Sequence, residues 1–454
     1  MILKKKTLRY YYWLMLEFAK KHVKLITLSF LLTFFVIISF ISFSPYFASF
    51  FFARRDVIGI VGNYTIGELP DEIITKISHG LINFDQNGSL IPALASSWEI
   101  TDGGRQFRFH IKQNLYWDDN KLFTAHDINY HFADVETKVV DDNTIHFILK
   151  KPLPIFPSFL NKPITRFPLH GVVGLYKVDQ IKESFGRVNE ISLTPNKSTL
   201  PHTTYKFYKT EGDMINAYKL GQISQMKINK KSLADSLRAW KNTKVEKSVD
   251  YTQALTLFFN TSSPILKEKE VRQAIAQSIP QEDIADLGEI ATSPIPPTSW
   301  AYNPGLKRIV YNPDIAKKKL EPYSDASGSA VLNFQTSYEY FDIASRVNDS
   351  LQKAGLKTKL NLDVFRDIGG FDMLLAFWKV PQDPDQYFFW HSTQKQGNIT
   401  GYKNGKIHKL LEDGRNTLAI EKRKKIYYDF QKVFMDDLPA VFLYYPNVYT
   451  ISRK

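Results

Sequence analysis

Apolar and polar residues alternate with two distinct periods along most of this chain. Phe107, Phe109 and Ile111 alternate with Arg108 and His110, which is typical of a half-buried strand. Other runs that are apolar or alternate in the same way predict strands over 57–61, 135–140, 144–149, 255–259, 331–334, 360–364, 373–377 and 440–445. Asp141-Asp142-Asn143 separates two of these runs, which predicts a β-hairpin.

Between these predicted strands, apolar residues recur every three or four positions, which predicts helices. Val271, Ala274, Ile275 and Ile279 recur on one face of a predicted helix. Further helices are expected over 71–79, with a stop at Gly80, and over 212–220, 340–353, 407–413 and 421–435. Another helix is expected to begin at Asn312-Pro313. Because strands and helices alternate irregularly, we expect a mixed α/β protein with at least two lobes.

The N-terminal region has a different pattern. Residues 25–53 contain no charged side chain, and the run 25–43 is long enough to cross a hydrocarbon core of ~30 Å as one helix. Tyr10–Trp13 form an aromatic cluster beside basic residues, which suits a membrane interface. We therefore predict a basic cytoplasmic or interfacial segment over 1–24, a transmembrane anchor over 25–53, and the remainder outside the cell. A cleaved signal peptide is the alternative, although its apolar region would be shorter.

Charge gives little support to nucleic-acid binding. The net charge is +13, but residues 1–55 carry nine Lys and Arg against Glu17 alone, so the other 399 residues carry only +5. Basicity is therefore a property of the predicted anchor region rather than of a binding surface.

Motifs for catalysis or metal binding were not found in the sequence. There is no Cys, which excludes disulfides, thiolate metal sites and a Cys nucleophile. Phosphate-binding glycine loops, a His-Glu-x-x-His pair and a Gly-x-Ser-x-Gly turn are also absent. We expect no enzyme activity, no catalytic residue, no metal and no cofactor.

The segment 378–390 carries the most information about ligand binding. It follows the buried strand 373–377 and places aromatic residues and Asp383-Pro384-Asp385 just beyond a strand end, where α/β proteins hold ligands. A Pro-stiffened surface turn with core aromatics is the alternative.

Several segments in order along 56–445 resemble family 5 solute-binding proteins of ABC transporters, the peptide/nickel group. These segments are 79–81 with Pro92–Glu99, 107–111 with Thr124–Ile128, Phe259-Asn260-Thr261, Val271–Ala274, 314–320 and Asp383-Pro384-Asp385. The resemblance implies a two-lobed periplasmic-binding-protein fold of class II. Lobe I would comprise 56–256 plus 439–454, lobe II would comprise 257–438, and Asn260 would lie at the hinge.

The resemblance also implies the ligand and its site. A peptide or other small solute would be gripped between the lobes and delivered to ABC permease subunits by a monomeric binding protein. The ligand-binding residues that we predict follow strand ends or the loop after Trp390: Trp378, Asp383, Tyr338, Tyr64, Asn398 and Tyr402.

One departure from the family affects the ligand. In peptide-binding members a carboxylate three residues after the strand-end Trp pairs with the ligand's amino terminus, whereas Trp378 is followed by Lys379, Val380 and Pro381. That carboxylate is missing here, or Asp383 replaces it from a shorter loop and would anchor a cationic group of the ligand. The alternatives are therefore a ligand-free scaffold or sensor that contacts another membrane protein and, with less support, a metal or haem carrier or an exported hydrolase.

Overall fold

The computed structural model describes residues 5–51, 55–86, 88–324, 331–362 and 370–454. The chain divides into two compact units, one of residues 1–56 with Ser198–His202 and one of residues 57–197 with 203–454. We describe each unit by itself.

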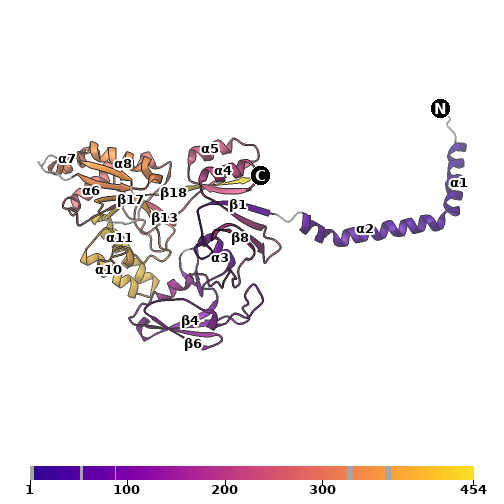
Figure 1. Ribbon diagram of the computed structural model, residues 1–454, viewed down its shortest axis with the longest axis horizontal. Helices are drawn as coiled ribbons and strands as arrows, with labels where there is room; N and C mark the ends of the chain where they lie inside the picture. The colour runs from indigo at the N-terminus through magenta and orange to yellow at the C-terminus, as the bar shows by residue number, and fades with distance from the viewer. Residues whose placement is uncertain (1–4, 52–54, 87, 325–330, 363–369) are drawn as a thin grey trace. The chain divides into compact units, whose positions relative to one another are not determined.

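The first unit contains two helices, α1 (Lys5–Lys21) and α2 (Val23–Phe51), which meet at a bend near His22 (Figure 1). Among the described residues, no single helix meets both the length and the hydropathy expected of a membrane span. Arg9–Lys21 and Val23–Ser39 meet them together, as a pair bent by 80°. A single straight anchor helix over 25–53 is therefore not established by the structure.

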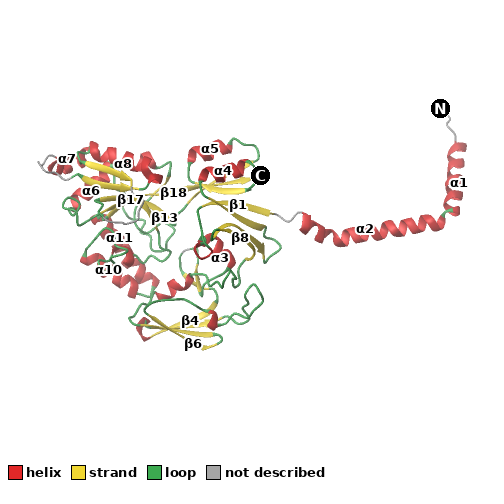
Figure 2. Cartoon of the chain, viewed as in Figure 1, coloured by secondary structure: helices red, strands yellow, loops and turns green. Residues whose placement is uncertain are grey.

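The second unit is built around a twelve-stranded sheet with the order β16-β15-β17-β13-β18-β11-β1-β10-β9-β8, with β12 and β14 also pairing with β18. Figure 2 shows the strands in yellow. The first half of this unit contains the following elements: β1 (Arg55–Val61), α3 (Asp71–Ile77), β2 (Ile82–Phe84), β3 (Leu90–Pro92), β4 (Ala95–Thr101), β5 (Gln106–Ile111), β6 (Val135–Asp141), β7 (Thr144–Leu149), β8 (Tyr176–Ser184), β9 (Arg187–Pro195), β10 (His202–Tyr208), α4 (Glu211–Lys219), β11 (Gln225–Ile228), α5 (Lys231–Arg238) and β12 (Thr243–Val249).

The second half contains β13 (Gln253–Phe259), α6 (Lys269–Ser278), β14 (Gly288–Ile290), α7 (Pro313–Ser324), β15 (Leu332–Thr336), α8 (Phe341–Lys353), β16 (Thr358–Leu362), β17 (Met373–Lys379), α9 (Tyr387–Trp390), α10 (Gly405–Asn416), α11 (Ile420–Asp437) and β18 (Ala440–Arg453). Every strand and helix predicted above from periodicity is present, with ends shifted by up to three residues, except that the strand predicted over 440–445 continues to Arg453. The predicted strand 360–364 extends beyond Leu362 into residues that lie outside the described ones.

A separate four-stranded sheet, β4-β5-β7-β6, lies within the first half and includes the predicted hairpin as β6 and β7 (Figure 1). Its apolar face contributes Phe107, Phe109, Ile145 and Phe147 to a buried core. The alternation seen in the sequence therefore separates a covered face from a solvated one.

Gly80 does not terminate the preceding helix, because α3 ends at Ile77. A Cβ at position 80 would lie 2.4 Å from the carbonyl oxygen of Leu160 and 2.6 Å from the carbonyl carbon of Asn161. The glycine is needed for close approach of two backbone segments, which sequence spacing alone does not reveal.

Both faces of the sheet are covered in the second half. On β17, Met373 and Leu375 belong to one core with α6 and α8, while Leu374 and Trp378 belong to another with α10 and α11. Because successive side chains point to opposite faces, a strand covered on both sides must be apolar throughout. This explains the uninterrupted apolar run 373–377.

The two halves are joined through β18. Ala440–Tyr444 pairs with β13, whereas Asn447–Arg453 pairs with β12, so the strand exchanges partners near Pro446 and Asn447. The chain also passes from the first half to the second between β12 and β13, at residues 250–252. Asn260, predicted at the hinge, follows the opposite end of β13, where its backbone N–H donates to Asp372 O at 2.8 Å.

A buried arginine fixes the end of α11. Arg272 of α6 is 3 % exposed and donates to the carbonyl oxygens of Leu266, Lys267, Asp437 and Leu438, at 2.6–3.1 Å, and to the Asp437 carboxylate at 2.8 Å. It therefore satisfies helix-end carbonyls just where the chain enters β18.

We expect Arg272→Met to lower the free energy of unfolding by about 3–5 kcal/mol, because buried acceptors and the Asp437 charge lose their partner. Urea unfolding of the purified protein measures this change. Arg238→Ala removes an exposed pair with Asp235 and should cost less than about 1 kcal/mol. Equal losses for the two variants would contradict the role given to Arg272.

Candidate ligand-binding site

An apolar cavity of about 340 Å³ lies at the end of β17. It is lined by residues of β13, β17, α9 and the loop after α9: Phe258, Leu374, Ala376, Phe377, Trp378, Lys379, Phe388, Phe389, Trp390, Gln396, Gly397 and Ile399. Lys379 is the only charged residue among them. Such a cavity favours an apolar group of a ligand over a charged one.

Trp378 contributes a buried polar atom to this cavity. Its indole is 5 % exposed and packs against Phe389 and Phe442, with ring centroids 5.4 Å away in each case. The indole N–H is buried and has no hydrogen-bond partner among the described residues. Because an unpaired buried donor costs about 1–3 kcal/mol, an acceptor brought by a ligand would be stabilised here.

The outer edge of β17 is unpaired next to the cavity. The parallel pairing with β15 ends at Thr336 and Leu375, whereas β13 continues to pair with β17 as far as Lys379. Among the residues that the structure describes, no strand adjoins the β15 side of 376–379. Ser337 directly follows β15, and its buried hydroxyl has no hydrogen-bond partner among the residues that the structure describes.

The first half of the unit faces this strand end. The ammonium of Lys379 lies 3.5 Å from the carboxylate of Asp71 in the first turn of α3. The amide of Asn161 donates to the side-chain oxygen of Gln382 at 2.8 Å. The end of β17 and its following loop are thus contact points between the two halves.

The carboxylate of Asp383 is paired inside the protein. It accepts from Nη1 of Arg423 at 2.8 Å and from Nη2 at 2.5 Å, and both side chains are about nine-tenths buried. Burial acts to lower the pKa of Arg423, but Asp383 and Tyr427 outweigh it and raise that pKa. The prediction that Asp383 anchors a cationic ligand group is therefore not supported, because Arg423 already supplies its counter-charge.

Asp385 is paired in the same manner. Arg415 of α10 donates to its carboxylate through Nε at 2.9 Å and Nη2 at 2.8 Å. Burial raises the pKa of Asp385 even though Arg415 opposes the shift. Asp383 and Asp385 thus attach the loop to α11 and α10. This structural role agrees better with the alternative given above, a Pro-stiffened turn with core aromatics, than with ligand binding by the two carboxylates.

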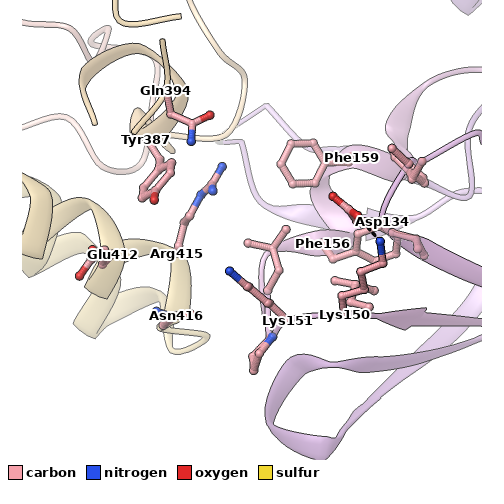
Figure 3. Close-up of a pocket in the computed structure, with 16 residues that line it drawn as sticks. Asp134, Lys150, Lys151, Phe156, Phe159, Tyr387, Gln394, Glu412, Arg415 and Asn416 are labelled. Carbon is pink, nitrogen blue, oxygen red and sulfur yellow. Dashed lines mark hydrogen bonds and ion pairs between the residues drawn. The ribbon is translucent and has the colours of Figure 1, made fainter. Parts of the chain in front are cut away.

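A larger cavity of about 860 Å³ opens between the two halves (Figure 3). Phe156, Phe159 and Lys151 line it from the first half, and Tyr387 and Arg415 line it from the second. The Arg415 guanidinium stacks over Tyr387 at 4.1 Å. Since Tyr387 lines this cavity and Phe388–Trp390 line the smaller one, α9 contributes to both.

The other predicted ligand-binding residues are dispersed. Tyr338 is 85 % exposed just after β15, and the Tyr64 hydroxyl donates to Val61 O at 3.3 Å. Asn398 and Tyr402 are buried and bond to each other, with Asn398 Nδ2 donating to Tyr402 O at 2.9 Å. Tyr402 also donates to Asp437 at 2.6 Å. These two residues therefore shape the loop after α9 rather than line the cavity.

Cavity residues that sequence reasoning missed include Phe388, Phe389 and Gln396. The first two lie in the segment singled out above, so its aromatic content was an available signal. Across the described ranges, no group of three or more His, Asp or Glu side chains is arranged to hold a metal ion.

We expect Asp383→Asn to destabilise the protein by about 3–5 kcal/mol, because the Arg423 charge would remain buried without a counter-charge. Chemical denaturation measures the loss, and adding Arg423→Met should recover part of it. Asp429→Asn, which removes an exposed pair with Lys432 on the same helix, should cost less than about 1 kcal/mol. A loss with Asp383→Asn no larger than with this control would contradict the structural role of the pair.

Comparison with known proteins agrees with this architecture. The family model for bacterial extracellular solute-binding proteins, family 5 Middle, matches residues 89–137 and 129–399. The oligopeptide-binding protein AppA of Bacillus subtilis is 24% identical, over 86% of this chain and 86% of its own.

Solved structures share the fold. The AppA structure in complex with a nonapeptide has a TM-score of 0.70 at 21% identity and covers 88% of this chain and 94% of its own. NikZ of Campylobacter jejuni, in complex with Ni(L-His), has a TM-score of 0.71 at 21% identity with the same coverage. The two-lobed periplasmic-binding-protein-like fold expected from the sequence is thereby confirmed. The chain belongs to family 5 of the bacterial extracellular solute-binding proteins.

Proposed function

We propose that this protein is the extracytoplasmic substrate-binding component of an ABC importer, and that it takes peptides at the end of β17. Family membership supports the transport role, and the similarity to AppA, a named oligopeptide-binding protein, supports the ligand class. The observation that carries the proposal is the unpaired edge of 376–379 beside an apolar cavity.

An extended peptide can use this edge as an added strand. Main-chain N–H and C=O groups of β17 that point away from β13 would bond to the peptide backbone. Alternate side chains of the peptide would point in opposite directions, so that one enters the 340 Å³ cavity while its neighbours face the other lobe. Main-chain recognition of this kind selects peptides as a class and tolerates many sequences.

Closure around the ligand would use contacts that already join the halves. Lys379 with Asp71 and Asn161 with Gln382 connect the end of β17 to lobe I. Bending at 250–252, between β12 and β13, and near Pro446, where β18 changes from pairing with β13 to pairing with β12, would open and close the lobes. We keep the two predicted lobes, 56–256 plus 439–454 and 257–438, but move their boundaries to 250–252 and to Pro446–Asn447, where the chain crosses between the halves. Tyr64 and Tyr338 remain candidate contacts, and the protein is proposed to be a monomer.

We further propose that the N-terminal helices hold the protein in the membrane, with the N-terminus cytoplasmic, and that captured peptide passes to permease subunits. The hydroxyls of Thr27, Ser29 and Thr33 donate to carbonyl oxygens of the preceding turn, at 2.7–3.0 Å, so α2 needs no outside partner for them. Apolar side chains such as Leu28, Phe30 and Leu32 are more than 60 % exposed.

A ligand-free scaffold or sensor is the second candidate. It is favoured by the pairing of both loop carboxylates with arginines, which leaves neither of them for a ligand amine. This candidate requires that no peptide bind the protein, so one binding experiment separates the two functions.

We expect Trp378→Phe to weaken peptide binding about 5–10-fold, because the indole N–H contributes one hydrogen bond of about 1 kcal/mol. Isothermal titration of the purified full-length protein with a mixture of tripeptides, before and after the change, measures this. Trp240→Phe makes the same change at an indole that is 40 % exposed and lies outside the cavity, so it should leave the affinity unchanged. Unchanged affinity in Trp378→Phe would remove Trp378 from the site, and no binding by the wild type would favour the scaffold.

We expect the native protein to remain in the membrane fraction after alkaline carbonate extraction. The double change Leu31→Arg with Phe35→Arg should release it, because each charge in a helix centre costs about 2.5–3.5 kcal/mol. Leu418→Arg, at an exposed leucine of the second half, is the matched control and should leave the protein membrane-bound. A soluble wild-type protein lacking its N-terminal residues would instead support a cleaved signal peptide.

A further inference from the structure

The charge that lines the cavity at the end of β17 is positive. Among the described residues that line it, Lys379 alone is charged, and its ammonium is exposed to solvent. The carboxylates that follow in the chain, Asp383 and Asp385, are bound by Arg423 and Arg415. A ligand ammonium at this position would meet a like charge and no free carboxylate from that loop.

The carboxylate that pairs with Lys379 is that of Asp71 in lobe I. Asp71 Oδ2 lies 3.5 Å from Lys379 Nζ, and both side chains are about 85 % exposed. An exposed pair of this kind contributes little stability, so another carboxylate can replace Asp71 at small cost. The position that Asp71 occupies beside Lys379 is therefore available to a negatively charged group of a ligand.

Trp378 adds a second donor next to Lys379. Its buried N–H has no partner among the described residues, and its ring lines the cavity. An oxygen acceptor on a ligand would gain a hydrogen bond there, whereas an ammonium has no acceptor to offer. The cavity thus combines an apolar wall with the indole donor of Trp378, the amide of Gln396 and the cation of Lys379.

We propose that the ligand places a carboxylate at Lys379 and an apolar side chain in the 340 Å³ cavity, so that a peptide enters with its C-terminal residue at the end of β17. This rests on the proposed peptide-binding function and specifies its polarity. It is the reverse of the orientation that the family resemblance implies, in which the amino terminus lies beyond the strand-end Trp. The unpaired edge of 376–379 receives the preceding peptide units.

Isothermal titration of the full-length protein in lipid nanodiscs tests this orientation. The probes are equimolar tripeptides ending in Leu or Phe, prepared as free acids, as C-terminal amides and as N-acetylated acids. The free acids should bind about two- to fivefold more tightly than the amides, because an ion pair with an exposed ammonium contributes only modestly. N-acetylation should leave affinity unchanged.

Variants assign the preference to Lys379. Lys379→Glu should abolish or reverse the preference for acids, and Asp71→Asn should strengthen acid binding several-fold by removing the competing carboxylate. Lys353→Glu makes the same change of charge at the exposed end of α8 and should leave the preference intact. Equal affinity for acids and amides, or a preference that survives Lys379→Glu, would overturn the proposal.

One more probe, 3-phenylpropanoate, distinguishes failure of the proposed orientation from failure of the proposed peptide-binding function. 3-Phenylpropanoate carries a carboxylate and an apolar body but no peptide group, so it should bind far more weakly than the peptide acids. If it binds as tightly, carboxylate recognition stands and the peptide function fails. If acids, amides and acetylated peptides bind alike, the peptide function stands and the orientation fails. If no probe binds, both fail.

Discussion

The strand β18 is the constraint on which the arrangement of the second unit depends. Its 14 residues pair with β13 and β14 at one end and with β11 and β12 at the other, so one uninterrupted segment belongs to both halves of the sheet. Breaking its pairing in either half would leave buried backbone groups without partners. The halves can therefore bend about this strand but remain connected through it, and the end of β17 stays opposite lobe I.

Charged side chains near the site fall into two groups with different roles. Arg272, Arg423 and Asp385 are buried, and their partners fix helix ends and the loop after β17. Lys379 and Asp71 are exposed and form a weak pair between the halves. Buried pairs hold the site in shape because losing one partner is costly, whereas an exposed pair can exchange its partner for a ligand. Burial thus separates residues that build the site from those that can bind.

The unpaired portion of β17 arises from a difference in strand length. β15 ends at Thr336 and turns into the helical segment that precedes α8, while β17 continues to Lys379 beside β13. Four residues of a central strand consequently lose their neighbour on one side. Their position next to an apolar cavity supports peptide capture, which requires both main-chain groups and space for a side chain.

The amino-acid sequence by itself determined the element types and the family. The continuous apolar run 373–377 predicted a buried strand, and helical spacing placed α6, because periodicity is a local property of the chain. Only the tertiary structure decided which carboxylates are free. Arg423 lies 40 residues beyond Asp383, and no local pattern indicates that they pair. The same holds for Gly80 and for the open edge of β17, since each depends on where a distant segment ends or approaches. Periodicity is fixed by neighbours in sequence, whereas the chemistry of this site is fixed by neighbours in space.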